Sequence, residues 1–284
     1  MDAQSTLQQK KTTAHSASSA TKQQVIEKAF DCDQSHWDQE IKNTILSVID
    51  DLDSGLLRVA HFDAHTWHHN SWIQKAILCY FRLTENVVNQ QTPLPFKDKI
   101  DSKFKHKPLE NLACRIVPPT HVRYGAYIGS QCVLMPSFVN IGAYIDDYTM
   151  VDTWATIGSG AQIGKHVHIS GGVGIGGVLE PPQAKPTIIE DHCFIGARSE
   201  IAEGVHIRRG AVLAMGTFLS QSTKIFDRTT GKLYTGQIPE DAVVVPGSMP
   251  STDGKYHLYT AIIVKYADHK TRAKTSINDI LREF

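Results

Sequence analysis

The sequence of 284 residues predicts a mainly β chain: a coil of short parallel strands, with an α-helical domain before it and a small β/α cap after it. Large apolar residues recur at every sixth position in the middle of the chain, apolar stripes with helical spacing precede them, and strand-like segments follow. The predicted parts are a disordered polar extension at 1–22, the helical domain at 23–112, the coil at 113–222, and the C-terminal strands with a closing helix at 223–284.

The N-terminal extension is polar, low in complexity and without the apolar centre of a signal peptide. No window approaches the ~18 apolar residues that a membrane-spanning helix needs. The 29 basic and 29 acidic side chains balance, which argues against a nucleic-acid-binding protein with a strong basic field. The five cysteines are scattered and form no CxxC pair, as in proteins of a reducing compartment. We therefore expect a soluble cytoplasmic protein without a nucleic-acid or membrane partner.

Two amphipathic helices are predicted in the helical domain. The segment QEIKNTILSVIDDLDSGLLRVA has apolar residues at helical spacing, and Ser54 with Gly55 ends the helix. The segment NSWIQKAILCYFRL has a second stripe, and the proline-containing NQQTPLPFKDKID after it predicts an irregular connection. The two stripes are formed by Ile41, Ile45, Leu46, Ile49 and Leu52, and by Trp72, Ile73, Ala76 and Tyr80.

A six-residue repeat is the main signal of the middle of the chain. Small or β-branched residues recur four places after many of the large apolar ones, and small residues often follow them directly. A coil with three six-residue sides per turn points every large side chain inward, and about five turns would stack at the ~4.8 Å spacing of paired strands. The predicted inward residues are Tyr127, Val133, Val139, Ile145, Val151, Ile157, Ile163, Ile169 and Ile175, then Ile189, Ile195, Ile201, Ile207, Leu213 and Leu219.

The repeat is interrupted at residues 176–188, which are too many for a corner of the coil. We interpret them as a loop that leaves the coil. Long loops of repeat proteins often cover a binding face, and an insertion without a role is the alternative.

Gly172, Gly174 and Gly177 match the pattern GxGxxG, which is typical of a dinucleotide-binding turn. Such a turn opens a helix after its last glycine, and the prolines of the following VLEPPQAKP exclude that helix. We therefore interpret these glycines as corner residues of the coil.

The C-terminal part predicts a cap for the open end of the coil, whose last turn would otherwise have unpaired strand edges. TKIFDRTTGKLYTG predicts two strands around a Thr-Gly turn, DAVVVPGSMP and HLYTAIIVKYA are strand-like, and TSINDILREF predicts the closing helix.

Longer stretches carry a resemblance to a known family. They are RIVPP, VLMPSFVNIGAYIDDYTMVDTWATIGSGAQIGKHVHISGGVGIGGVLEP, PTIIEDHCFIGARSEIAEGV and DGKYHLYTAIIVK. Together they resemble the tetrahydrodipicolinate N-succinyltransferases, a family of hexapeptide-repeat acyltransferases, over nearly the whole chain from about residue 25. The resemblance implies a left-handed parallel β-helix and a homotrimer with active sites between neighbouring coils.

The same resemblance implies an activity. A succinyl group would pass from succinyl-CoA to the amine of ring-opened tetrahydrodipicolinate, on the route to diaminopimelate and lysine. Succinyl-CoA would be a cosubstrate, and neither a permanently bound cofactor, a metal nor a covalent enzyme intermediate is expected.

The resemblance also implies three site residues. Arg115 in CRIVPP matches the family's substrate-binding arginine, and a guanidinium can hold an acceptor carboxylate through two parallel hydrogen bonds. Asp152 in MVDTWATIG matches the substrate aspartate, and Glu200 in GARSE matches a second acidic catalytic residue of the cleft. The attacking amine must be a free base, so a carboxylate would receive its proton or hold it in place. Without the resemblance, a surface ion pair and solvated carboxylates would be the simpler interpretation.

The phosphates of CoA require cations. A basic run near the closing helix, made of Lys265, Lys270, Arg272 and Lys274, is the candidate, with a solvated charged face as the alternative.

Four histidines in or near the coil are candidate zinc ligands. Zinc needs three ligands that converge at ~2.0 Å, whereas His166, His168, His192 and His206 fall in differing phases of the repeat. We therefore predict no metal site, and we interpret HTWHH at 65–69 as an aromatic-rich surface turn. Three alternatives stay open: a coil acyltransferase with another donor or acceptor, a metal-dependent hydratase like the γ-type carbonic anhydrases, and a non-catalytic scaffold.

Overall fold

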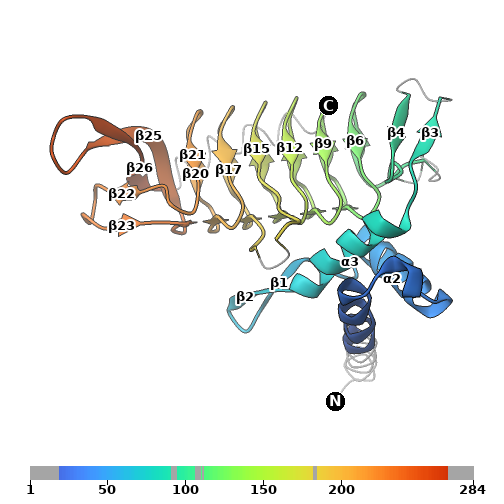
Figure 1. The fold of residues 1–284 in the computed structure, drawn as a ribbon. Coiled ribbons are helices and arrows are strands. Elements are labelled where there is room, and N and C mark those ends of the chain that lie inside the picture. Colours follow the sequence, from blue (N-terminus) through green and yellow to red (C-terminus); the bar gives the residue numbers. More distant parts are fainter. Residues whose placement is uncertain (1–18, 91–94, 106–109, 111, 182–183, 268–284) are drawn as a thin grey trace, which may run out of the picture.

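The coil of short parallel strands is the main body of the protein (Figure 1). The helices gather beside the N-terminal end of the coil, and long antiparallel strands extend its other end (Figure 1). This structure is a computed structural model that describes residues 19–90, 95–105, 110, 112–181 and 184–267. Of the predicted disordered extension at 1–22, residues 1–18 lie outside the described residues, as does the predicted closing helix, whereas residues 19–22 belong to a helix, so the prediction was wrong for them.

The N-terminal domain contains both predicted amphipathic helices. In α2 (Gln39–Asp53), the carboxylate of Asp38 accepts a hydrogen bond from the Ile41 N–H at 2.9 Å, and Gly55 with a φ of +77° follows the helix end. Both predicted stripes are buried except for Leu46, which is exposed. The remaining elements are a helix over 19–31, η1 (Gln34–His36), α3 (Ser71–Leu83), and two antiparallel hairpins, β1 (Ala60–Asp63) with β2 (Thr66–His69) and β3 (Val87–Asn89) with β4 (Phe96–Asp98). The second hairpin shows that the predicted irregular connection was wrong for β4, which pairs with β3.

Three parallel sheets form the walls of the coil, and each turn adds one two-residue strand to each sheet. Sheet 1 contains β7 (Tyr127–Ile128), β10 (Tyr144–Ile145), β13 (Gln162–Ile163), β16 (Ile188–Ile189), β19 (His206–Ile207) and β24 (Gln237–Ile238). Sheet 2 begins with β5 (Arg115–Ile116), β8 (Val133–Leu134), β11 (Met150–Val151), β14 (His168–Ile169), β17 (Phe194–Ile195) and β20 (Val212–Leu213). Sheet 3 contains β6 (His121–Val122), β9 (Phe138–Val139), β12 (Thr156–Ile157), β15 (Gly174–Ile175), β18 (Glu200–Ile201) and β21 (Phe218–Leu219).

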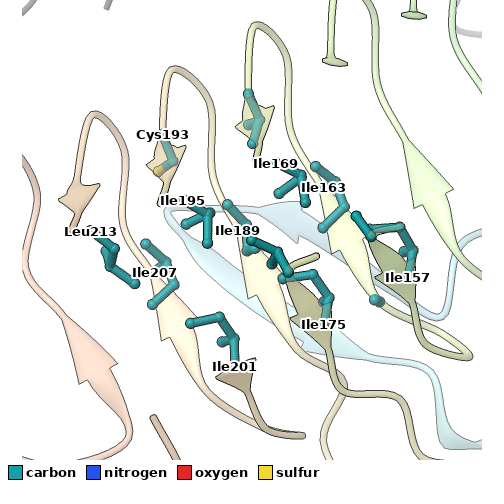
Figure 2. Close-up of a cluster of buried hydrophobic side chains, with 14 of the residues drawn as sticks. Ile157, Ile163, Ile169, Ile175, Ile189, Cys193, Ile195, Ile201, Ile207 and Leu213 are labelled. Carbon is teal, nitrogen blue, oxygen red and sulfur yellow. The ribbon is translucent and has the colours of Figure 1, made fainter. Parts of the chain in front are cut away.

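Apart from Ile116 in β5, the second residue of each of these strands belongs to the buried core or packs against it, and the isoleucines form one continuous column (Figure 2). From Val139 to Leu219 every predicted inward residue lies in this buried core. The first two predictions were wrong, because Tyr144 pairs with Tyr127 and Met150 pairs with Val133 on the outer surface. The column there contains Leu134, and Ile128 packs against the buried core. The coil side between Leu134 and Val139 therefore has five residues instead of six.

The interruption at 176–188 is an insertion between two regular turns. Ile145 pairs with Ile163, 18 residues later, whereas Ile163 pairs with Ile189, 26 residues later. The hydroxyl of Thr187 donates to the carbonyl oxygens of Gly176 (2.9 Å) and Ala202 (3.0 Å), which closes the base of the insertion. The interruption is therefore a loop that leaves the coil, as predicted, but its predicted bounds were too wide. Ile188 lies in β16, and the Gly176 N–H still donates to the carbonyl of Ile201 at 2.7 Å.

The N-terminal domain packs on sheet 1. The guanidinium of Arg58 lies 3.6 Å from the ring centroid of Tyr144, and its Nε donates to Oε1 of Gln162 at 3.0 Å. The fully buried side chain of Gln74 donates to Val178 O (3.0 Å) and Ala184 O (3.2 Å), so α3 holds both ends of the insertion. Sheet 1 is thus the wall of the coil on which the N-terminal domain packs.

The C-terminal strands continue sheet 2 and cover the last turn of the coil. The strand β25 (Ala242–Pro250) pairs parallel with β20, and β26 (His257–Tyr266) pairs antiparallel with β25. The predicted hairpin around the Thr-Gly turn is also present, as β22 (Ile225–Asp227) and β23 (Leu233–Tyr234). The described strands of the cap do not bury sheet 3 at residues such as Thr156 and Glu200, which are exposed.

Candidate active site on the coil wall

Asp152 lies at the corner between sheet 2 and sheet 3. It directly follows the inward Val151, and its N–H donates to the carbonyl of Ile169 at 2.8 Å, which fixes the backbone at this corner. Its Oδ1 accepts hydrogen bonds from the N–H of Thr153 at 2.6 Å and from the Thr153 hydroxyl at 3.1 Å. The side chain is half-buried, so the corner presents an oriented carboxylate at the surface of the coil.

Glu200 lies on the outer surface of sheet 3, beside an apolar cavity. It precedes the inward Ile201 in β18 and is exposed. The cavity has a volume of about 300 Å³ and includes Glu200, Phe218 and Tyr259 in its lining. The N–H of Phe218 donates to the hydroxyl of Tyr259 at 2.7 Å, and burial raises the pKa of that hydroxyl. The arrangement offers a carboxylate at the side of a groove with aromatic walls.

Arg198 is a charged residue of this wall that the sequence analysis missed. Its side chain lies against Gly172, where a Cβ would approach Nε to 2.6 Å, and the Gly172 N–H donates to the carbonyl of Thr153 at 2.8 Å. The guanidinium therefore lies one strand spacing from the Asp152 corner. Arg198 follows Gly172 by 26 residues, the same spacing that separates Ile169 from Ile195, and this spacing was the available signal.

The glycine pattern serves three different purposes. Gly172 is a corner residue with a φ of +66°, as predicted. Gly174 lies inside β15, so the corner interpretation was wrong for it. A Cβ on Gly177 would lie 2.0 Å from the Ser159 nitrogen, so this glycine is required by close contact between coil turns.

Arg115 lies in β5, the first strand of sheet 2, and is exposed. Asp152 follows β11, two strands further along sheet 2, and Glu200 lies in sheet 3 a further two turns along. At ~4.8 Å per strand, each of these steps spans about 10 Å along the coil. A single chain therefore does not bring the three predicted site residues into contact.

A larger cavity of about 480 Å³ lies between the β1–β2 hairpin and sheet 1, and none of the predicted site residues lines it. Glu190 lies in it, with its Oε1 accepting from Trp67 Nε1 (3.0 Å) and 2.7 Å from His206 Nε2. Its Oε2 accepts from the Arg209 N–H at 2.9 Å. Burial opposes ionisation, but these hydrogen bonds prevail and hold the pKa of Glu190 at about 2. This carboxylate is fully engaged in joining the hairpin to the coil.

The histidines of the coil are distributed over its outer surface. His166 and His192 occupy the same corner on successive turns and stack at 5.0 Å between ring centroids, so the prediction of differing phases was wrong for this pair. His168 stacks on Phe194 in sheet 2, and His206 lies on sheet 1. No group of three or more His, Cys, Asp or Glu side chains within the described ranges is arranged to hold a metal ion.

The segment HTWHH at 65–69 forms the turn and second strand of the β1–β2 hairpin. Of the predicted phosphate-binding cations, Lys265 is exposed on β26, whereas Lys270, Arg272 and Lys274 lie outside the described residues. None of the helices that the structure describes is long and apolar enough to cross a membrane.

Comparison with known proteins agrees with the fold of the N-terminal domain and with that of the coil. A family model described as the N-terminal part of tetrahydrodipicolinate N-succinyltransferase matches residues 21–83, and a model of the hexapeptide repeat of succinyltransferases matches residues 186–221. The coil is accordingly the left-handed parallel β-helix of the hexapeptide-repeat proteins.

Curated relatives match over most of their length and carry the name 2,3,4,5-tetrahydropyridine-2,6-dicarboxylate N-succinyltransferase. The protein of Dechloromonas aromatica is 58% identical, over 84% of this chain and 89% of its own. That of Acinetobacter baylyi is 55% identical, over 86% and 90%, and that of Sodalis glossinidius is 52% identical, over 92% and 97%. At this identity and coverage, the chain belongs to the tetrahydrodipicolinate N-succinyltransferase family.

Proposed function

We propose that the protein transfers the succinyl group of succinyl-CoA to the amine of ring-opened tetrahydrodipicolinate, L-2-amino-6-oxopimelate. The products are N-succinyl-2-amino-6-oxopimelate and CoA, in the diaminopimelate and lysine pathway. The observation that carries the proposal is the 52–58% identity to named N-succinyltransferases over at least 84% of the chain. Asp152 and Glu200 support it, because both carboxylates lie at the outer surface of adjoining coil walls.

The reaction is acyl transfer from a thioester to nitrogen. The amine lone pair attacks the thioester carbonyl, a C–N bond forms, and collapse of the tetrahedral intermediate breaks the C–S bond. The amine loses one proton and the CoA thiolate gains one. A carboxylate is a weak base toward an ammonium group, so we assign Asp152 to hold the amine in line for attack. Glu200 is assigned to the same cleft, and Arg115 to a carboxylate of the acceptor.

The active site is proposed to form between two copies in a homotrimer. Trp154 and Met215 lie at the same coil corner as Asp152 and are 64% and 69% exposed, which supports coverage of this corner by a neighbouring coil. A threefold arrangement repeats one interface three times and closes on itself. In such an assembly, Glu200 of one copy would approach Asp152 of the next.

Mixed assemblies test the shared site. Asp152→Asn and Glu200→Ala chains are each expected to fold as trimers and, when purified alone, to keep at most about one thousandth of the wild-type turnover. When the two chains are co-expressed and assort at random, one interface in four combines both native carboxylates, so about one quarter of the wild-type turnover per site should return. A mixture that stays inactive although mass analysis shows mixed trimers would place both residues in one chain's own site, and full activity of Asp152→Asn would remove that residue from the mechanism.

The acyl donor and the site for the CoA phosphates have separate tests. Thiol release is measured with a panel of acyl-CoA thioesters, and succinyl-CoA should give the highest kcat/KM, whereas preference for acetyl-CoA would identify a relative with a different donor. Lys265, Lys270 and Lys274 are proposed to bind the phosphates of CoA, so their replacement by alanine should raise the KM for the donor without lowering kcat.

We also propose a cytoplasmic location. It is supported by the five cysteines, which are all free thiols.

A further inference from the structure

Gly174 lies directly beneath the carboxylate of Glu200. The two residues pair as neighbours in the strands β15 and β18. A Cβ added to Gly174 would lie 1.9 Å from Oε2, 2.6 Å from Cδ and 2.8 Å from Oε1. All three nearest atoms belong to the Glu200 carboxyl group, so that group rests on the bare backbone of Gly174.

The backbone at Gly174 does not itself require glycine. Its φ lies outside the left-handed region, unlike that of Gly172, and its nearest neighbours do not include main-chain atoms. Ile175 and Ile201, the next residues in the same two strands, point into the core, so Gly174 and Glu200 both face outward (Figure 2). Close approach of the carboxylate therefore explains the glycine, where a strand residue with a side chain would otherwise fit.

The space left by the missing side chain of Gly174 determines where the Glu200 carboxylate lies. Thr156 and Phe218 occupy the same outward row on either side of the pair, and both have side chains. Glycine is the one residue in the row from Phe138 to Phe218 that leaves room for a neighbouring side chain to lie flat along the sheet. A methyl group there would move the carboxylate outward by more than about 1 Å to reach normal contact.

We propose that Gly174 is a positioning residue for the transfer reaction. Because it has no side chain, the Glu200 carboxylate can lie close to the backbone of sheet 3, in the position that the reaction requires. The proposal rests on the function assigned above. Misplacement of a reacting group by about 1 Å can cost about 100-fold in rate. Because the carboxylate is the far end of a flexible side chain, it can move away without disturbing the coil.

The test is Gly174→Ala in the full-length protein. We expect kcat to fall about 100-fold, with the KM for succinyl-CoA changed less than about twofold and the melting temperature within about 2 °C of wild type. The matched control adds the same methyl group where no carboxylate lies over it, in the double variant Gly174→Ala/Glu200→Ala. The double variant should be as active as Glu200→Ala alone.

Two results would overturn the proposal. One is wild-type kcat in Gly174→Ala, and the other is a loss that is equally large in the Glu200→Ala background, since the methyl group would then act on something else. If the wild-type protein fails to release CoA from succinyl-CoA with the acceptor, the proposed function itself has failed. The crystal structure of Gly174→Ala then decides the positioning claim, because an unmoved Glu200 carboxylate contradicts it.

Discussion

Sheet 1 and sheet 3 are built from the same six-residue repeat, yet outward residues of their middle turns differ in burial. On sheet 1, Gln162 and Ile188 are buried, the former against the N-terminal domain. On sheet 3, Thr156, Glu200 and Phe218 are exposed. The repeat constrains only the inward column, so the outward positions can diverge. The N-terminal domain packs on one wall of the coil, and the exposed residues of another carry the proposed active site.

The largest expected effect is on sheet 3 and concerns activity alone. Glu200→Ala should lower kcat about 1000-fold, because the cleft loses a charged group of the proposed mechanism. The free energy of unfolding should change by less than about 0.5 kcal/mol, because the side chain is exposed. Steady-state kinetics and urea denaturation measure the two quantities. If Glu200→Ala lowered the free energy of unfolding as much as a substitution of a buried residue does, the proposed difference between sheet 1 and sheet 3 would be wrong.

The next effect is on sheet 1 and concerns stability. Gln162→Ala removes the acceptor of the Arg58 Nε hydrogen bond and the donor to Gly160 O at 2.8 Å. Burial already lowers the pKa of Arg58, so its guanidinium depends on this partner. We expect a cost of about 3 kcal/mol in the free energy of unfolding, measured by urea denaturation. An unchanged midpoint would mean that the N-terminal domain does not depend on this contact.

The fold could be predicted from the sequence because the inward column repeats strictly. The prediction failed at Tyr127 and Val133 because each is followed by another large apolar residue, Ile128 and Leu134. A periodic pattern cannot choose between two such neighbours, and only strand pairing with Tyr144 and Met150 resolves it. A single five-residue side was enough to shift the register.

The candidate site was less accessible to sequence reasoning. Asp152 and Glu200 are candidates by resemblance, whereas Arg198 and the proposed role of Gly174 depend on which residues stack across the insertion. Residues 26 positions apart become neighbours there, instead of 18 as in the turns directly before and after the insertion. The position of one side chain over another is a property of the folded wall, and no local pattern encodes it.

A third prediction concerns pH and again sheet 1. The folded pKa of Glu190, about 2, lies below its ordinary value of 4.5. The carboxylate therefore contributes stability that is complete above about pH 4.5 and is lost as the pH falls toward 2. Glu190→Gln should cost about 2 kcal/mol at pH 7, allowing for solvent screening, and should flatten this acid limb of the stability curve.

The matched control for Glu190 is Glu203→Gln, since Glu203 is an exposed glutamate on the same turn of the coil. Unfolding by urea is followed at a series of pH values for both variants and the wild type. Equal acid limbs in the wild type and Glu190→Gln would show that the contacts with Trp67 and His206 do not stabilise the fold.

The smallest effect completes the comparison. Thr156 and Gln162 are outward residues of successive strands, β12 in sheet 3 and β13 in sheet 1, on the same turn of the coil. Thr156→Ala should change the free energy of unfolding by less than about 0.5 kcal/mol, because its side chain is exposed. Urea denaturation beside Gln162→Ala gives the difference directly. A cost at Thr156 as large as that at Gln162 would mean that strand propensity, and not the domain docked on sheet 1, determines what an outward position contributes.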